Sequence, residues 1–160
     1  MRLLVTGGCG FIGSAFLRRA LAAPDVERLV NVDCLTYSGR RENDSELESD
    51  ERYRFVQADI ADAEAIGAVF ESEQPTAVVN FAAESHVDRS LFAARRFVQT
   101  NIEGTLCLLE AARGQQEQSG QELRFVHIST DEVYGDLGEG GGLFHEGLPL
   151  APKNPYSATK

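Results

Sequence analysis

The chain has 160 residues, of which 42% are hydrophobic and 25% are charged, a balance typical of one globular domain with a hydrophobic core. We therefore treat residues 1–160 as a single domain. The formal net charge is −10, which argues against a nucleic acid partner because an acidic chain repels phosphate through its overall field.

Short apolar runs alternate with helical patterns along the chain. The strand-like runs are Arg2–Thr6, Arg28–Asp33, 54–60, 76–83 and 123–130. Helical patterns cover 11–23, 62–73 and 91–113, and the polar stretch 35–51 predicts a loop. On the first helix, one apolar face is expected to hold Phe11, Ile12, Ala15, Phe16 and Ala20. This alternation predicts an α/β fold, a doubly wound parallel sheet with helices on both faces.

The turn after the first strand reads TGGCGFIG and spaces Gly7, Gly10 and Gly13 three residues apart. A tight turn there needs positive φ, and a pyrophosphate at the start of a helix needs bare backbone beside it. A glycine triplet alone is a weak signal, but this one follows a strand and opens an amphipathic helix, which is the context a dinucleotide fingerprint requires. The sequence therefore predicts a Rossmann-type NAD-binding domain.

Asp33 ends the second strand about 20 residues beyond the glycine turn, where an acidic residue can accept both ribose hydroxyls of the cofactor. Its charge would repel a 2′-phosphate, so NAD is favoured over NADP. Arg40 and Arg41 follow within the loop and keep NADP open as an alternative.

The end of the sequence, NPYSATK, spaces Tyr156 and Lys160 four residues apart, which puts them on one face if the segment is helical. Pro155 fits the first turn of such a helix. A tyrosine can act as a base near neutral pH when an ammonium group favours its phenolate. Taken alone, Y-x-x-x-K is better explained as an ordinary surface pair, because the pattern is common by chance. Combined with the glycine turn at the other end of the chain, it favours a catalytic pair.

The stretch HISTDEVYG, residues 127–135, places Thr130, Asp131 and Glu132 side by side where the fifth strand ends. Turn chemistry would be satisfied by a single Asp or Ser. Taken alone, the two adjacent carboxylates and the hydroxyl leave open whether this stretch is a solvated turn or a functional site, and a solvated turn is the simpler interpretation.

These motifs together resemble the extended branch of the short-chain dehydrogenase/reductase superfamily. Within it, LVTGGCGFIGS, VNVDCLTYSG, ADIAD, FAAESHVDRS, TNIEGTLCLLEAAR, HISTDEVYGDL and NPYSATK follow the order seen in dTDP-glucose 4,6-dehydratases. The resemblance covers nearly the whole chain, and STDEVYG is its most specific piece. Two alternatives stay open: a nucleotide-sugar 4-epimerase or decarboxylase, and a non-catalytic NAD-binding module.

The resemblance implies a role for each catalytic residue in removing water from dTDP-glucose. Tyr156 would be the base for oxidation at C4, tuned by Lys160, while Thr130 would hydrogen-bond the C4 oxygen. Glu132 would remove the C5 proton. Asp131 would donate a proton to the departing C6 hydroxyl, which requires it to be protonated near neutral pH.

The resemblance also implies further contacts to NAD and to the sugar. Cofactor contacts are expected from Phe11, Ile12, Asp33, Cys34, Leu35, Thr36, Asp59, Ile60, Phe81, Ala82, Ala83, Ser85 and Thr100, together with Tyr156 and Lys160. Ser85 and Thr130 are also expected to bind the sugar. Family members continue beyond residue 160 with a C-terminal substrate domain, which this chain is expected to lack. A homodimer through the helix at 91–113 is expected, with burial of that face inside the subunit as the alternative.

Three cysteines, Cys9, Cys34 and Cys107, show neither metal-ligand spacing nor a disulfide framework. We therefore expect no metal and a reducing, cytoplasmic location. No apolar run is long enough to cross a bilayer, and the residues after Met1 lack a signal-peptide layout, so no membrane partner is expected.

Overall fold

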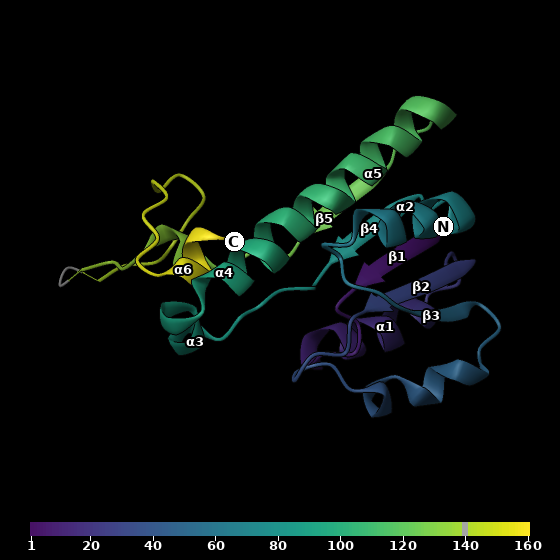
Figure 1. Ribbon diagram of the computed structural model, residues 1–160, viewed down its shortest axis with the longest axis horizontal. Helices are drawn as coiled ribbons and strands as arrows, with labels where there is room; N and C mark the ends of the chain where they lie inside the picture. Colours follow the sequence, from purple (N-terminus) through teal and green to yellow (C-terminus); the bar gives the residue numbers. More distant parts are fainter. Residues whose placement is uncertain (139–140) are drawn as a thin grey trace. The chain divides into compact units, whose positions relative to one another are not determined.

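The structure, a computed structural model, describes residues 1–138 and 141–160. Its strands form one parallel sheet in the order β3-β2-β1-β4-β5 (Figure 1). The strands are β1 (Arg2–Thr6), β2 (Arg28–Asp33), β3 (Tyr53–Gln57), β4 (Ala77–Asn80) and β5 (Arg124–His127). The strand order reverses direction between β1 and β4, and ligands of open α/β sheets bind at such a switch point.

The described residues divide into two compact units. Unit 1 consists of Met1–Ala82 and Glu103–Ile128, and it contains the whole sheet. Unit 2 consists of Ala83–Ile102 and Ser129–Lys160. The two units are described separately below.

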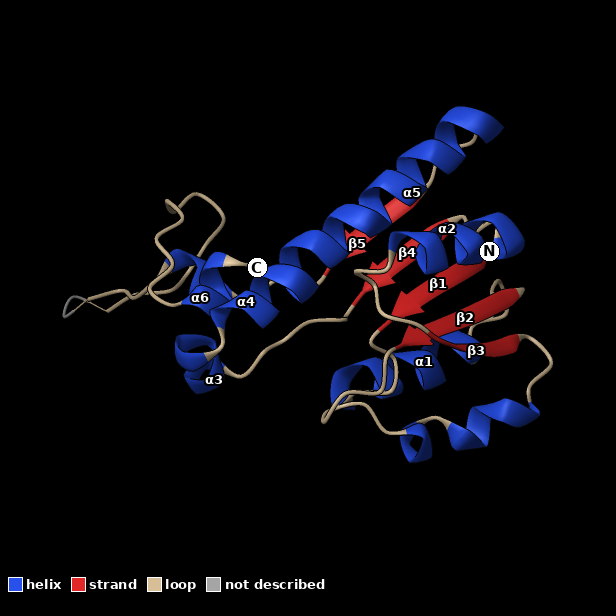
Figure 2. Cartoon of the chain, viewed as in Figure 1, coloured by secondary structure: helices blue, strands red, loops and turns tan. Residues whose placement is uncertain are grey.

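Helices cover both faces of the sheet in unit 1 (Figure 2). They are α1 (Phe11–Leu21), α2 (Ala63–Glu73) and α5 (Gly104–Ser119). Successive residues of a strand point to opposite faces. In β1, Leu4 accordingly packs in the cluster with α2 and α5, whereas Leu3 and Val5 pack in the cluster with α1. The predicted doubly wound parallel sheet is confirmed.

Unit 2 is built from short helical segments and loops. Its helices are α3 (Val87–Phe92), α4 (Ala94–Phe97) and α6 (Pro155–Ala158), with a 3₁₀ helix at Asp131–Tyr134. A π-helical segment, Val98–Glu103, precedes α5.

The predicted single helix over 91–113 is wrong in extent. The chain forms α3, α4, the π-helical segment and α5 in succession, and α5 continues to Ser119. Ala93 separates α3 from α4 because its φ of −135° and ψ of 41° are not helical. Gly120 ends α5 in the left-handed conformation at φ 66°, a common way for a helix to stop. The loop predicted at 35–51 also contains two 3₁₀ helices, Arg41–Asn43 and Ser45–Ser49.

The apolar face predicted for α1 is wrong at its N-terminal end. Phe11 and Ile12 are 91% and 63% exposed, and Ala15 is exposed as well. The buried positions are Gly13, Ser14, Leu17 and Leu21, with Phe16 and Ala20 partly buried against the same core. Gly13 and Ser14, which are small and not strongly hydrophobic, contact the core at the start of α1, so a search for hydrophobic periodicity does not find them.

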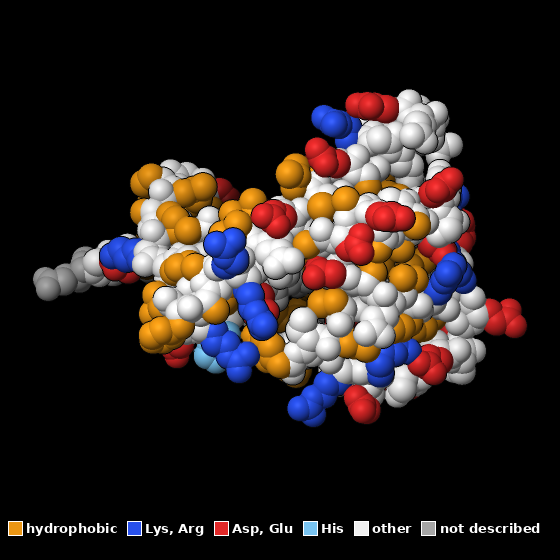
Figure 3. Space-filling view, in the orientation of Figure 1, with side chains coloured by type: hydrophobic (Ala, Val, Ile, Leu, Met, Phe, Trp, Pro, Cys, Tyr) orange, Lys and Arg blue, Asp and Glu red, His pale blue; other side chains and the backbone are white. Residues whose placement is uncertain are grey.

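None of the helices in the described ranges is long and apolar enough to cross a membrane. Acidic and basic side chains are interspersed on the face shown in Figure 3.

The inward face of α1 can be tested with a matched pair of substitutions. Leu17→Ala removes a fully buried side chain and should lower the free energy of unfolding by about 2–5 kcal/mol. Ile12→Ala truncates an exposed side chain on the same helix and should change it by less than about 0.5 kcal/mol. Urea denaturation of both variants checks this, and equal losses would contradict the assigned face.

Candidate active site

The turn between β1 and α1 packs tightly against the sheet in unit 1. Gly7 has a φ of 71°, and a Cβ atom there would lie 2.6 Å from the Ala82 nitrogen. A Cβ atom on Gly13 would lie 2.3 Å from the Gly7 carbonyl oxygen. Real side chains do not tolerate such contacts, so Gly7 and Gly13 require glycine for the tight turn and the close packing of the helix, and the role of the turn in binding NAD stays a prediction.

The N-terminus of α1 is open to an anionic group. Its N-cap residue is Gly10, no side chain caps the first turn, and no acidic residue lies in that turn. Arg18 and Arg19 lie in the last turn, the arrangement that complements the helix dipole. The bare glycine cradle and uncapped helix start suit the pyrophosphate of a dinucleotide.

Asp33, at the end of β2, faces the glycine turn. It is 8% exposed, and its carboxylate accepts hydrogen bonds from the Cys9 N–H (2.9 Å) and the Leu35 N–H (2.8 Å). Burial raises the pKa of this carboxyl group. Leu35 takes a φ of 56° in the turn that follows, so the predicted ribose contacts, including Cys34 and Thr36, lie in a strained turn beside Asp33.

Arg41 does not stand free to hold a 2′-phosphate. Its guanidinium pairs with Asp44 and Glu48 and lies 3.8 Å from the centre of the Phe55 ring. This arrangement favours the NAD prediction over NADP, because a cation paired with two carboxylates has little attraction left for a third anion.

The other predicted cofactor positions of unit 1 follow the strand ends at the carboxyl edge of the sheet. Phe81 packs its ring on Phe16 with centroids 5.1 Å apart, and Ala82 donates its N–H to Thr6 Oγ1 (3.4 Å). Asp59 accepts the Ala61 N–H at 2.9 Å. Ile60 is only 3% exposed, and its side chain packs in the hydrophobic core rather than facing a ligand.

Unit 2 carries Thr130, Asp131 and Glu132 at the start of the 3₁₀ helix. Thr130 caps this helix: its hydroxyl accepts the Glu132 N–H (3.3 Å) and donates to Asp131 Oδ1 (3.4 Å). Asp131 is exposed, whereas Glu132 is half-buried and accepts a hydrogen bond from Asn154 Nδ2 at 3.2 Å. The two adjacent carboxylates therefore have different surroundings.

Asn154 also fixes the helix that carries Tyr156. It forms a capping box with Ser157, and Pro155 occupies the first helical position as predicted. The Tyr156 ring packs edge-on against buried Phe97, with centroids 6.5 Å apart. One asparagine thus ties Glu132 to the helix of Tyr156, a link that the sequence motifs did not reveal.

α6 ends at Ala158 with Thr159 as its C-cap, and Lys160 is the last residue of the given sequence, so the shared helical face of Tyr156 and Lys160 stays a prediction. The Lys160 N–H bonds to the Ser157 carbonyl (3.3 Å) rather than continuing the α-helical pattern from Tyr156. Burial lowers the pKa of the Lys160 ammonium to about 8. Its charge can therefore change within the pH range in which enzymes work.

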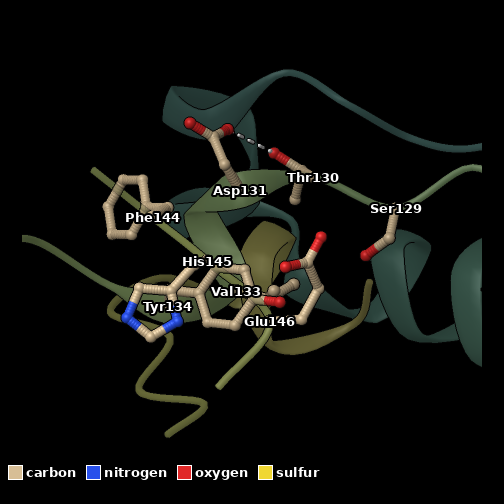
Figure 4. A pocket seen from close by; sticks show the side chains of 8 residues that line it. All are labelled: Ser129, Thr130, Asp131, Val133, Tyr134, Phe144, His145 and Glu146. Carbon is tan, nitrogen blue, oxygen red and sulfur yellow. Dashed lines mark hydrogen bonds between the residues drawn. The ribbon is translucent and has the colours of Figure 1, made fainter. Parts of the chain in front are cut away.

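A pocket of about 390 Å³ opens beside Thr130 and Asp131 in unit 2 (Figure 4). Its lining residues are Ser129, Thr130, Asp131, Val133, Tyr134, Phe144, His145 and Glu146. Tyr134 and Phe144 stack with centroids 5.8 Å apart. No sequence pattern linked residues 144–146 to the Thr130 segment.

Asn101 is a further residue that sequence reasoning did not single out. It is 3% exposed, and its side chain bonds both the N–H (2.8 Å) and the carbonyl (3.0 Å) of Glu84. It also donates to Thr159 Oγ1 at 2.9 Å. Asn101 therefore holds the backbone of Glu84, next to the predicted contact residue Ser85, and the side chain of Thr159, next to Lys160. Its neighbour Thr100, a predicted cofactor contact, is half-buried on the same segment.

Removing the Asn101 side chain should destabilise the protein markedly. Asn101→Ala leaves the buried N–H and carbonyl of Glu84 without these partners, which should lower the free energy of unfolding by about 2–4 kcal/mol. Gln99→Ala, at an exposed neighbour on the same segment, serves as the control and should cost less than about 0.5 kcal/mol. Equal denaturation midpoints for the two variants would refute the assigned role.

Comparison with known proteins places this geometry in a family. The family model described as GDP-mannose 4,6 dehydratase matches residues 4–160. Curated relatives include the dTDP-glucose 4,6-dehydratase of Neisseria meningitidis serogroup B, 52% identical over 99% of this chain and 46% of the relative. The dTDP-glucose 4,6-dehydratase 1 of Escherichia coli K12 is 48% identical over 100% of this chain and 47% of its own length.

Solved structures agree in fold over the whole chain. DesIV, a dTDP-glucose 4,6-dehydratase of Streptomyces venezuelae crystallised with NAD and a second ligand, gives a TM-score of 0.88 at 45% identity, covering 100% of this chain and 48% of that one. The UDP-glucose 4-epimerase of Thermus thermophilus, solved with NAD, gives 0.85 at 35% identity, covering 100% and 47%. The chain thus spans about half the length of the relatives it matches. The resemblance read from the motifs is confirmed, and the chain belongs to the GDP-mannose 4,6 dehydratase family.

Proposed function

We propose that the complete protein is a dTDP-glucose 4,6-dehydratase that uses NAD and forms dTDP-4-keto-6-deoxyglucose. The arrangement of Thr130, Asp131 and Glu132 carries the proposal, because one carboxylate is exposed beside a pocket while its neighbour is anchored to the helix of Tyr156. Relatives that carry this activity in their names support it.

The residues of unit 1 fit the dinucleotide. The glycine turn and the uncapped start of α1 would hold the pyrophosphate of NAD, and Asp33 would accept hydrogen bonds from its adenosine ribose. When bound, NAD supplies the hydride acceptor for C4 and the hydride donor for C6.

The residues of unit 2 move the protons. Tyr156 takes the proton of the C4 hydroxyl, helped by the Lys160 ammonium, and Thr130 hydrogen-bonds the C4 oxygen. The C4 ketone acidifies the proton on C5, which Glu132 removes and gives back to C5 when hydride is delivered to C6. Asp131 protonates the C6 hydroxyl as it leaves as water. Adjacent carboxylates with different surroundings are what such a division of acid and base requires.

The proposal also covers the oligomeric state and the location of the protein. We expect a homodimer, because Leu106 and Leu109 on α5 remain 53% and 45% exposed, more than inner core residues would be. We expect a cytoplasmic location, because all three cysteines are free thiols. The net charge of −10 gives no reason to expect a nucleic acid partner.

The proposed reaction removes one water from the substrate, and mass spectrometry can detect this directly. The complete gene product incubated with dTDP-glucose and NAD should yield a sugar nucleotide lighter by one water. Asp131→Asn and Glu132→Gln should each slow this by about 10²–10⁴-fold and leave NAD binding intact. Asp136→Asn, at an exposed carboxylate paired with Lys153, is the matched control and should react normally.

The mass of the product also separates the alternatives. A product of unchanged mass and altered retention would indicate a 4-epimerase, which needs no acid at C6. An unreacted substrate with NAD still bound would indicate a non-catalytic module.

The activity should fall at high pH as Lys160 loses its charge. The pKa of about 8 means that the ammonium is present below pH 8 and is lost above it, so kcat/KM should decline there. Lys160→Arg keeps a positive charge at every working pH and should remove this decline, although its absolute rate will be lower. Rate profiles between pH 6 and 10 check this, and the same decline in both proteins would assign it to another group.

A further inference from the structure

A buried carboxylate, Asp44, lies at the centre of a polar cluster in unit 1 that the proposed mechanism does not use. Asp44 is 0% exposed. Its Oδ2 accepts hydrogen bonds from Asn31 Nδ2 (3.0 Å), the Tyr53 hydroxyl and the Arg41 guanidinium. Its Oδ1 is buried with no hydrogen-bond partner among the described residues. Burying a carboxylate with one unpaired oxygen is energetically costly, so we expect Asp44 to have a role beyond the structure of its own loop.

Asn31 links this carboxylate to the glycine turn. The Gly8 N–H donates to Asn31 Oδ1 at 3.0 Å, while Asn31 Nδ2 donates to Asp44 and to the Tyr53 hydroxyl (3.0 Å). A Cβ atom on Gly8 would lie 2.2 Å from Asn31 Oδ1, so the amide rests directly against the turn backbone. The position of Gly8, between Gly7 and Gly10 of the fingerprint, is thus set by Asn31.

The same loop holds the next residue of the turn. The Cys9 carbonyl accepts hydrogen bonds from the Arg40 N–H (3.1 Å) and from Asn43 Nδ2 (2.7 Å). Cys9 Sγ lies 3.6 Å from Asp44 Oδ2. Burial, with the nearby Asp33 and Asp44 carboxylates, raises the pKa of the Cys9 thiol to about 12, so it remains a protonated donor.

The chemistry of an amide makes this arrangement depend on the Asp44 charge. Asn31 can present either its oxygen or its nitrogen to the turn, and only the oxygen can accept the Gly8 N–H. An ionised carboxylate accepts but never donates, so Asp44 holds the nitrogen end of Asn31 on its own side. Arg41 neutralises the buried charge.

We propose that Asp44 is a positioning residue for the glycine turn: through Asn31 it fixes the backbone that receives the cofactor pyrophosphate, without touching the cofactor. The inference rests on the proposed NAD binding. It predicts that affinity for diphosphate-bearing ligands depends on a buried carboxylate in the loop between β2 and β3.

The test compares Asp44→Asn with Glu48→Gln in the complete gene product by isothermal titration calorimetry. The amide introduced by Asp44→Asn can present its NH₂ group to Asn31, so the Asn31 side chain is no longer held in one orientation. The affinities for NAD and for ADP should therefore fall about tenfold. Adenosine carries no phosphate, and its affinity should change less than twofold. Glu48→Gln removes the exposed carboxylate on the same Arg41 and should leave all three affinities unchanged.

A second variant separates positioning from stability. The double variant Arg41→Met, Asp44→Leu replaces the buried charge pair by apolar groups, which should restore the melting temperature relative to Asp44→Asn. Affinity for NAD should stay about tenfold weaker than in the unaltered protein, because Asn31 loses the Asp44 acceptor. It keeps only the Tyr53 hydroxyl, which has lost its own acceptor and can turn to present its hydrogen instead. If Asp44→Asn does not fold, this double variant carries the test alone.

The outcomes distinguish this inference from the proposed function. Unaltered protein that binds NAD, with variants that bind it equally well, would overturn the positioning role and leave the proposed function standing. Equal losses for adenosine and ADP, or affinity that recovers with stability in the double variant, would also overturn it and assign Asp44 a structural role. Unaltered protein that fails to bind NAD would overturn the proposed function and the inference together.

Discussion

The backbone of the turn between β1 and α1 comes so close to the end of β4 that Gly7 has no room for a Cβ atom. Much of unit 1 depends on this approach. It brings the start of α1 to the carboxyl edge of the sheet, where the strand order reverses. It also requires small residues, Gly13 and Ser14, on the inner side of the first helical turn. The hydrophobic anchoring of α1 therefore begins only at Leu17.

A turn built mostly of glycine has few side chains to pack, so polar contacts must hold its backbone in place. The backbone of Gly8 and Cys9 is held by Asn31, Asp33 and Asn43, two of them from β2 and one from the loop beyond it. Asn31 and Asp33 satisfy the N–H groups of Gly8 and Cys9, and Asn43 adds a second donor to the Cys9 carbonyl, which also accepts the Arg40 N–H. The close approach of the turn to the sheet excludes side chains at Gly7 and Gly13. The buried polar cluster then holds the turn in place of the packing that those side chains would have provided.

The sequence predicted the features that local patterns determine. Strand positions followed from apolar runs, and the glycine turn followed from spacing in a strand-to-helix context. Patterns failed where tertiary contacts decide the outcome. Phe11 and Ile12 looked like core residues but are exposed, and the single helix predicted over 91–113 is interrupted at Ala93. Asn101, Asn154 and Asp44 went unnoticed because a buried polar residue has no periodic signature, and its partners lie far away in the sequence.

The adjacent carboxylates at Asp131 and Glu132 show why local structure matters to chemistry. A turn needs only the Thr130 hydroxyl, which already caps the 3₁₀ helix. In a 3₁₀ helix, consecutive side chains point about 120° apart, so neighbours in sequence do not become neighbours in space. Asp131 can therefore reach solvent beside the pocket while Glu132 bonds Asn154. Two carboxylates on one α-helical face would repel each other. Here the consecutive positions have separate surroundings, as the acid and base roles proposed for Asp131 and Glu132 would require.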